Sequence, residues 1–179
     1  MSRAIYWFRH IRTKQVLATL ERSVLARPRL LKGQIPESLR PSTIRPDHWT
    51  PLVVAHGFES EKTQADAFTL ATQPGHPLVP LTKEQLDQYR LLPNKTKRLV
   101  DMDMEEKQIA QLARTLIYLE AVKSPVVPTE NGLKLFWETM DWVQKVEDAG
   151  LKWPKWVEHG LLDTTRGNII LNSELRSIP

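Results

Sequence analysis

Residues 5–20 read IYWFRHIRTKQVLATL, two runs rich in aromatic and β-branched residues that are separated by a short polar segment. Runs of this kind are typical of paired strands, so the stretch predicts an antiparallel β-hairpin. No Asn-Gly or Asp-Gly dipeptide marks a two-residue turn, and we expect a loop of about three to five residues. Arg9, His10, Arg12 and Lys14 lie around this loop without an acidic residue. A solvent-facing turn does not need four basic groups, which suggests that something negatively charged lies opposite them.

The hairpin needs further elements, because a two-stranded ribbon alone is marginally stable. The apolar run 52–55 can add a third strand, and residues 60–71 predict a helix with Ser60 as its N-cap. Thr82 and Gln85 form the capping-box pattern of another helix start. We therefore predict an α+β fold: a small antiparallel sheet made of the N-terminal hairpin and a third strand, covering helices, and an α-helical C-terminal part with an extended tail.

Two amphipathic helices are expected in the C-terminal half. Apolar residues recur at helical spacing between Ile109 and Ile117, after Asp103, which can cap this helix. A second helix is expected over 131–150, NGLKLFWETMDWVQKVEDAG, and it should pair antiparallel with the first. The chain is thus expected to have two parts: 1–92, a basic α+β domain with the hairpin and a proline-rich connector, and 93–179, a helical hairpin with an extended C-terminal tail.

Composition narrows the classes of function. This chain has no cysteine, which excludes disulfides, thiolate catalysis and cysteine-based zinc sites. Its five histidines lack the spacing of a metal site, and no nucleophile motif or glycine-rich phosphate loop is present. Asp101, Asp103, Glu105 and Glu106 could be a magnesium site, but acids at a helix start more simply complement the helix dipole. We expect no enzymatic activity, no metal and no cofactor.

Charge is distributed unevenly along the chain. Residues 1–48 contain ten Lys and Arg against three Asp and Glu, whereas residues 99–179 contain nine against thirteen. A basic segment of this density is typical of proteins that bind a polyanion, because neutralised phosphates release condensed counterions. An anionic membrane fits less well, since no apolar run approaches the roughly 20 residues that span a bilayer. We therefore expect a nucleic-acid partner and no membrane span.

The expected contacts come from three basic segments. Prolines at 28, 36, 41 and 46 should break every candidate helix between residues 22 and 49, leaving extended pieces and short turns that suit a groove of phosphates. Taken singly, each arginine there is more simply an ordinary solvated loop residue, but the whole set together favours a nucleic-acid contact. A second small cluster is expected just ahead of the helix that Asp103 caps. The predicted RNA-binding residues are Arg9, His10, Arg12, Lys14, Arg22, Arg27, Arg29, Lys32, Arg40, Arg45, Trp49, Lys95, Lys97 and Arg98.

A resemblance to a known family covers most of the chain. The run IYWFRHIRTKQVL resembles the Ile-Tyr-x-x-Arg-Asn-Ile-Arg-Thr-x-Gln-Val signature of a fungal family named for mitochondrial homologous recombination and transcription regulation. Members of that family are also large-subunit proteins of the fungal mitochondrial ribosome. His10 stands where asparagine is usual. Further stretches agree in the same order: IPESLRPSTIRPDHWTPL, KTKRLVDMDMEEKQIAQLARTL, LFWETMDW and WPKWVEHG.

The resemblance implies a structural constituent of the mitochondrial large ribosomal subunit, ribosome-associated in the matrix, without a catalytic site. Its partners would be large-subunit rRNA and neighbouring mitochondrial ribosomal proteins. The alternative is a mitochondrial DNA-binding factor in homologous recombination or transcription regulation, for which mitochondrial DNA is the partner. Phosphate contacts carry no base information, so charge does not separate the two. A degenerate GIY-YIG-like nuclease is less favoured, because Ala4-Ile5-Tyr6 resembles the first tripeptide of that family but the second tyrosine and glycine are missing.

Overall fold

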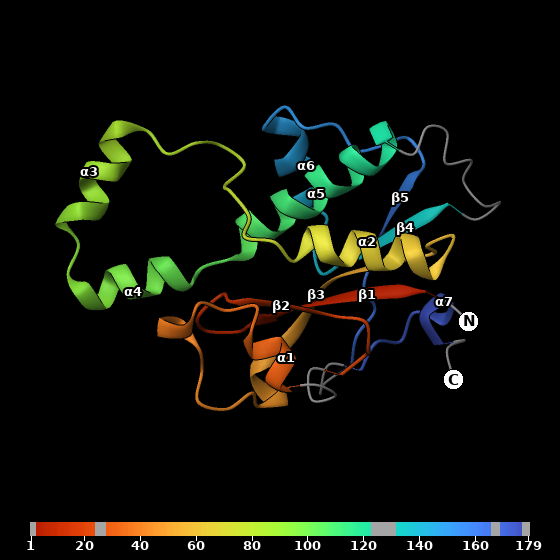
Figure 1. Ribbon diagram of the computed structural model, residues 1–179, viewed down its shortest axis with the longest axis horizontal. Coiled ribbons are helices and arrows are strands. Elements are labelled where there is room, and N and C mark those ends of the chain that lie inside the picture. The colour runs from red at the N-terminus through yellow and green to blue at the C-terminus, as the bar shows by residue number, and fades with distance from the viewer. Residues whose placement is uncertain (1–2, 24–27, 123–131, 166–168, 177–179) are drawn as a thin grey trace.

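The computed structural model describes residues 3–23, 28–122, 132–165 and 169–176 (Figure 1). The strands are β1 (Ala4–His10), β2 (Val16–Thr19), β3 (Trp49–His56), β4 (Leu133–Trp137) and β5 (Val157–Leu161). The α-helices are α1 (Pro28–Lys32), α2 (Glu61–Ala71), α3 (Lys83–Leu91), α4 (Asn94–Met102), α5 (Glu105–Val122), α6 (Asp141–Asp148) and α7 (Ser173–Arg176). Two short 3₁₀ helices, η1 (Glu37–Leu39) and η2 (Pro46–His48), lie between α1 and β3. The predicted α+β class is confirmed.

The strands form one sheet in the order β2-β1-β3-β4-β5. Neighbours from β2 to β4 are antiparallel, with Phe8 opposite Leu17 and Val54 opposite Phe136. β5 pairs with β4 in parallel. The predicted hairpin and third strand are therefore present, and they make up three strands of a larger, five-stranded sheet.

Helices cover both faces of this sheet, with α2 and α5 on one side and α1 and α7 on the other (Figure 1). On the first side, Ile5 and Trp7 of β1 share a core with Ala67 of α2 and with Leu112 and Leu116 of α5. Burying each large side chain contributes roughly 1.5–3 kcal/mol relative to exposure. This side of the sheet therefore carries the larger core.

The opposite face of β1 has its own core. Tyr6 and Phe8 lie in a cluster with Leu31 of α1, Trp49 of β3 and Leu175 of α7. Because β1 is buried on both faces, its sequence is a continuous apolar run instead of an alternating one.

A β-bulge accommodates a proline in β3. Trp7 pairs with Val53 and Phe8 pairs with Pro51, so Leu52 is the extra residue. Proline cannot donate a hydrogen bond to the ladder, and bulges are among the places where sheets tolerate it. As a result, the consecutive residues Leu52 and Val53 both join the core beneath α2 and α5.

Local capping signals are confirmed. The Ser60 hydroxyl accepts a hydrogen bond from the N–H of Thr63 at 3.0 Å, which makes Ser60 the N-cap of α2. Thr82 and Gln85 form the expected capping box at the start of α3, with each side chain accepting from the other residue's N–H. Both caps satisfy backbone donors that a helix start leaves free.

The prediction of one helix over 131–150 is wrong in its first half. Leu133–Trp137 forms β4, and α6 includes only Asp141–Asp148. An apolar run that is buried on both faces of a strand also matches a helical face, and pairing with β3 decides the outcome. The second helix of the expected pair is therefore shortened to α6, which still contacts α5, and β5 lies within the segment expected to be an extended tail.

This correction bears on the expected division of the chain. Because β3 pairs with β4, strands from both expected parts, 1–92 and 93–179, lie in one sheet. The boundary between the two parts stays a prediction.

The proline-rich connector is more helical than expected. Pro28 is the first residue of α1, and Pro46 is the first residue of η2. Proline suits the first helical position, because its φ is already fixed there and its missing N–H would have no intrahelical partner. The expectation that these prolines break every helix is therefore wrong at two of them.

Gly57 offers a test of the turn that follows β3. It has a φ of +99°, and a Cβ there would lie 2.7 Å from the carbonyl oxygen of Gly132. We expect G57A to lower the free energy of unfolding by about 2–4 kcal/mol, from backbone strain plus the clash. G150A is the matched control, because Gly150 has a φ of +87° but no heavy atom within 4 Å of that Cβ. G150A should cost about 1–2 kcal/mol in urea unfolding followed by tryptophan fluorescence; equal losses would contradict the clash.

Candidate nucleic-acid interface

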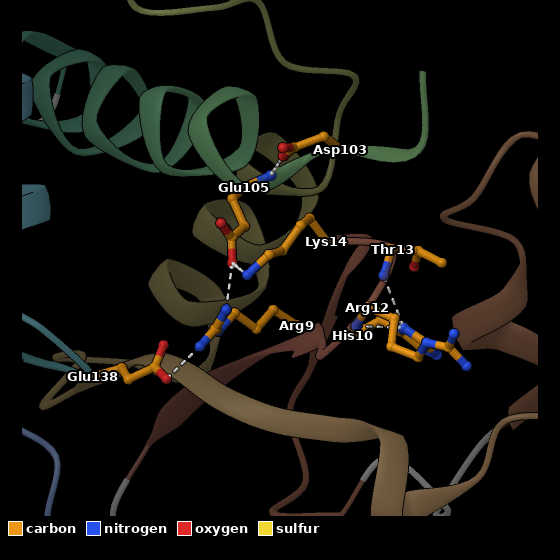
Figure 2. Close-up of polar contacts among 8 residues, drawn as sticks. All are labelled: Arg9, His10, Arg12, Thr13, Lys14, Asp103, Glu105 and Glu138. Atoms are coloured by element: carbon orange, nitrogen blue, oxygen red, sulfur yellow. Dashed lines mark hydrogen bonds and ion pairs between the residues drawn. The ribbon is translucent and has the colours of Figure 1, made fainter. Parts of the chain in front are cut away.

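The hairpin loop runs from Ile11 to Gln15 and is organised by the side chain of His10 (Figure 2). Its Nδ1 accepts hydrogen bonds from the backbone N–H groups of Arg12 at 3.2 Å and Thr13 at 3.1 Å. Asparagine and aspartate side chains order turns by accepting from the same backbone positions. His10 therefore orders this turn in the way that an asparagine or aspartate side chain commonly does.

His10 must be neutral at Nδ1 to accept these bonds. Burial, and to a lesser extent the electrostatic influence of the neighbouring His48 and Arg12 side chains, lowers the pKa of His10. Its ring meets those of His48 and Trp49 edge to face, with centroids 5.4 Å and 5.2 Å apart. The sequence predicts an RNA contact for His10. In the free protein its side chain mainly orders the loop.

Arg9 belongs to an internal ion-pair network and not to the loop tip (Figure 2). Its Nη1 lies 3.0 Å from Oε1 of Glu105, and its Nη2 lies 2.5 Å from Oε1 of Glu138. Burial opposes the guanidinium charge, but the bonds and charges of Glu138 and Glu105 outweigh it, so the pKa of Arg9 is raised. In this structure Arg9 pairs with internal carboxylates, and its expected contact with RNA stays a prediction.

The same network reaches Lys14, whose backbone has a φ of +60°. Its Nζ lies 3.7 Å from Oε1 of Glu105, while its side chain stays 38% exposed. Arg12 extends away from this network in Figure 2, and its side chain is exposed. Of the basic residues around the loop, Arg12 is the one most open to an external phosphate.

Trp49 is not available for base stacking. Only 1% of it is exposed, because β3 directs it into the core between the sheet and α1. Its position opposite His10 in the ladder fixes that orientation. Burial speaks against the predicted RNA contact of Trp49, which stays a prediction.

Hydrogen bonds bring three distant segments to one end of the sheet, beside α4 in Figure 1. The loop bonds to the connector through the N–H of Ile11 and the carbonyl of His48 at 2.9 Å. The carbonyl of Lys14 accepts from the N–H of Met104, between α4 and α5, at 3.0 Å. Arg98 of α4 bonds to the carbonyl of Ser38 in η1 at 3.5 Å. We call this surface the basic end and define it by Arg12, Lys14, Lys32, Arg40, Arg45, Lys95 and Arg98. Lys97 lies on another face of α4, two positions from Lys95, and donates to the carbonyl of Arg90 at 2.7 Å.

Three of the seven cations of the basic end are oriented by carbonyl groups. Arg40 Nε donates to the carbonyl of Ile35 at 2.8 Å, Arg98 Nη2 donates to that of Ser38 at 3.5 Å, and Lys32 Nζ donates to that of Ser42. A neutral carbonyl fixes the direction of a cation without cancelling its charge. Within the described part of the chain, the ion pairs of the basic end involve Lys14 and Arg45 only, the latter 2.8 Å from Asp47.

The carboxylates described at the basic end, Asp47, Asp101, Asp103 and Glu105, are fewer than its seven cations. Asp101 accepts from the Tyr89 hydroxyl at 2.7 Å, and Asp103 accepts from the N–H of Glu105, the first residue of α5, at 3.2 Å. Glu105 itself is held by Arg9. The basic end therefore keeps a net positive charge. In the sequence, the residues that carry this charge lie in three separate segments.

The remaining predicted contacts have different positions. Arg22 follows β2 and Arg29 lies in α1; both are exposed, and no described hydrogen bond joins them to the basic end. Arg27 lies outside the described residues. The cluster expected ahead of a helix does precede α5, and it lies within a further helix, α4, which begins at Asn94.

No candidate metal site is present in the part of the chain that the structure describes. No group of three or more histidine or acidic side chains that could hold a metal ion occurs in residues 3–23, 28–122, 132–165 and 169–176. Across the same ranges, no helix is both long and apolar enough to span a bilayer.

Substitution of His10 tests its role in the loop. H10A removes the acceptor for two backbone N–H groups and should lower the free energy of unfolding by about 1–2 kcal/mol. H10N keeps an acceptor in nearly the same place and should recover most of that loss. The measurement is urea unfolding at neutral pH, and an H10N variant as unstable as H10A would contradict the assignment.

Stability should also fall as the solution is made acidic. Burial lowers the pKa of His10, His56 and His159 in the folded protein below the ordinary value of 6.5. Just below pH 6.5 the unfolded chain therefore binds more protons than the folded one, and the free energy of unfolding rises with pH. The contribution of the neutral rings is complete above that pH and is lost below it. Urea unfolding between about pH 7.5 and about pH 5.5 should show this loss, with a smaller loss in H10N; an equal loss in H10N would exclude His10 as a contributor.

Comparison with protein-family models and with curated proteins found no match to this chain. The likeness to the fungal mitochondrial family thus stays an expectation, although one of its motifs has a clear structural role. In WPKWVEHG, His159 Nδ1 accepts from Trp137 Nε1 at 3.0 Å and its ring lies 5.0 Å from that of Trp153. A Cβ at Gly160 would lie 3.3 Å from the Phe136 ring. This motif fastens β5 to β4.

Proposed function

We propose that the protein is an RNA-binding structural component of the mitochondrial large ribosomal subunit, which contacts rRNA phosphates through the basic end. The observation that carries the proposal is the meeting of loop, connector and α4 at one end of the sheet, where carbonyl groups orient Lys32, Arg40 and Arg98. The resemblance of five stretches to a fungal mitochondrial family supports the ribosomal setting. Neighbouring mitochondrial ribosomal proteins and the matrix location belong to the same proposal.

The chemistry of the basic end suits an RNA backbone. Arginine presents a planar set of donors that can bind phosphate or stack on an unpaired base. Arg40 and Arg98 each donate one hydrogen bond to a backbone carbonyl. This bond limits the motion of the side chain and so reduces the conformational entropy that is lost when RNA binds. Arg12, Arg40 and Arg98 come from three segments, so together they can follow phosphates along a path.

The decisive experiment removes one guanidinium from each segment. We expect R12Q/R40Q/R98Q to bind an in vitro transcript of the mitochondrial large-subunit rRNA more weakly than the unaltered protein. Each lost phosphate contact reduces the slope of log affinity against log salt by about 0.7–0.9. The slope for the triple variant should therefore be smaller than that of the unaltered protein by about 2 to 3. The matched control is K62Q/K152Q/K155Q, which removes three exposed charges outside the basic end. Equal slopes for the two triple variants would refute the assignment.

A second measurement addresses the ribosome itself. The full chain should sediment with large subunits from a mitochondrial lysate in moderate salt, and R12Q/R40Q/R98Q should be released at lower salt than the control. If the unaltered protein stays off the large subunits, the ribosomal proposal fails. Pairing of homologous DNA strands by the purified protein would instead favour the recombination factor.

A further inference from the structure

Helices α3 and α4 form an arm that extends from the sheet and its covering helices (Figure 1). None of the residues of either helix, all of them described, is buried. Each helix has nine residues, fewer than the roughly 12–15 at which isolated helices become stable in water. Contacts between them are mainly polar: Tyr89 with Asp101, and Lys97 with the carbonyl of Arg90. The arm therefore lacks an apolar core of its own.

Large apolar side chains gather on this arm and on the loop before it. Their exposed fractions range from 41% for Leu86 to 85% for Leu91. Soluble proteins expose single apolar residues routinely, but a concentration of them marks an interaction surface. The group consists of Val79, Leu81, Leu86, Leu91, Leu99 and Val100.

Three of these residues line a cleft of about 650 Å³ between the arm and the body of the protein. Val79 and Leu81 come from the loop at 77–82, and Val100 comes from the end of α4. The ends of α5 and α6 nearest the arm complete the lining. A cleft of this size is in the range that takes a small ligand or a few side chains.

The charge at the cleft differs from that of the basic end. Asp103, Glu106 and Asp148 line it, against Lys107 and Lys145. Lys145 Nζ lies 4.4 Å over the ring of Trp142, which draws that cation toward an aromatic face. An apolar floor with an excess of carboxylates repels phosphates and complements a positively charged, apolar segment.

Helix α4 separates the two surfaces. Arg98 bonds to Ser38 at the basic end, whereas Val100 lines the cleft. Two positions along an α-helix correspond to a rotation of about 200°, so these side chains lie on opposite faces. RNA on one face of α4 leaves the other face free.

We propose that the cleft between the arm and the body binds a segment of a neighbouring protein that presents a few adjacent apolar side chains flanked by basic ones. The apolar side chains fill the space between Val79, Leu81 and Val100. The flanking cations meet Glu106 and Asp148. This site is separate from the basic end, and a protein segment can occupy it in the absence of RNA.

The test uses two synthetic amphipathic peptides of about 14 residues, one of leucine and lysine and one of leucine and glutamate, with identical leucine positions. Fluorescein-labelled peptides are titrated with the full chain and binding is followed by anisotropy. The protein carries a net charge of +4, so non-specific attraction favours the glutamate peptide. We expect the lysine peptide to bind about tenfold more tightly despite this. Equal affinities, or tighter binding of the glutamate peptide, would overturn the proposal.

Substitutions locate the binding. L81S/V100S removes two apolar side chains from the lining of the cleft and should lower the affinity for the lysine peptide by about tenfold or more. The matched control is L20S/V122S, which makes the same two changes at exposed positions outside the cleft lining. The control should stay within about twofold of the unaltered protein. Equal effects of the two double variants would overturn the proposal.

The two proposals fail separately. L81S/V100S should leave RNA affinity and its salt slope unchanged, and R12Q/R40Q/R98Q should leave affinity for the lysine peptide within about twofold. If L81S/V100S instead weakens RNA binding and not peptide binding, the cleft belongs to the RNA interface and the protein partner is ruled out.

Discussion

The ion-pair network around Arg9 is the constraint on which the arrangement of the basic end depends. One guanidinium joins β1 to Glu105 at the start of α5 and to Glu138 just after β4. The side chains of Arg9 and Glu105 are only 20% and 14% exposed, so loss of one partner would leave a poorly solvated charge, which costs more than the pair contributes. The network fixes the hairpin against the helix layer. It also occupies two carboxylates that would otherwise reduce the positive potential near Arg12.

The basic run at the hairpin therefore divides into side chains with different tasks. The pleat of β1 sends Arg9 and His10 to opposite faces, so Arg9 meets carboxylates while His10 meets Trp49. Beyond the strand, Arg12 points outward and Lys14 turns back toward Glu105. Some cations of this basic run thus stabilise the fold, and others remain exposed and can bind a partner. The same hairpin contributes to the core sheet and to the proposed contact surface.

Local features of this chain could be predicted from sequence, because their causes lie within a few residues. The hairpin, the Ser60 cap and the Thr82–Gln85 capping box are examples. Other features depend on distant partners: β4 is a strand because it pairs with β3, and Arg9 is neutralised by residues 96 and 129 positions away. No pattern near residue 9 signals those glutamates. The burial of Trp49 likewise follows from the packing of α1 and α7 on the sheet.

Helix α4 contributes residues to both proposed surfaces, so binding at one surface would affect binding at the other. It buries none of its residues, so a partner on either face supplies contacts that the helix lacks in the free protein. RNA held by Arg98 would stabilise the helix that presents Val100, and a protein segment at Val100 would stabilise the helix that presents Arg98. Thermodynamic linkage makes such an effect reciprocal, so each partner would raise the affinity for the other by the same factor. A two-faced helix without a core of its own is therefore suited to ordered assembly of RNA and protein around one chain.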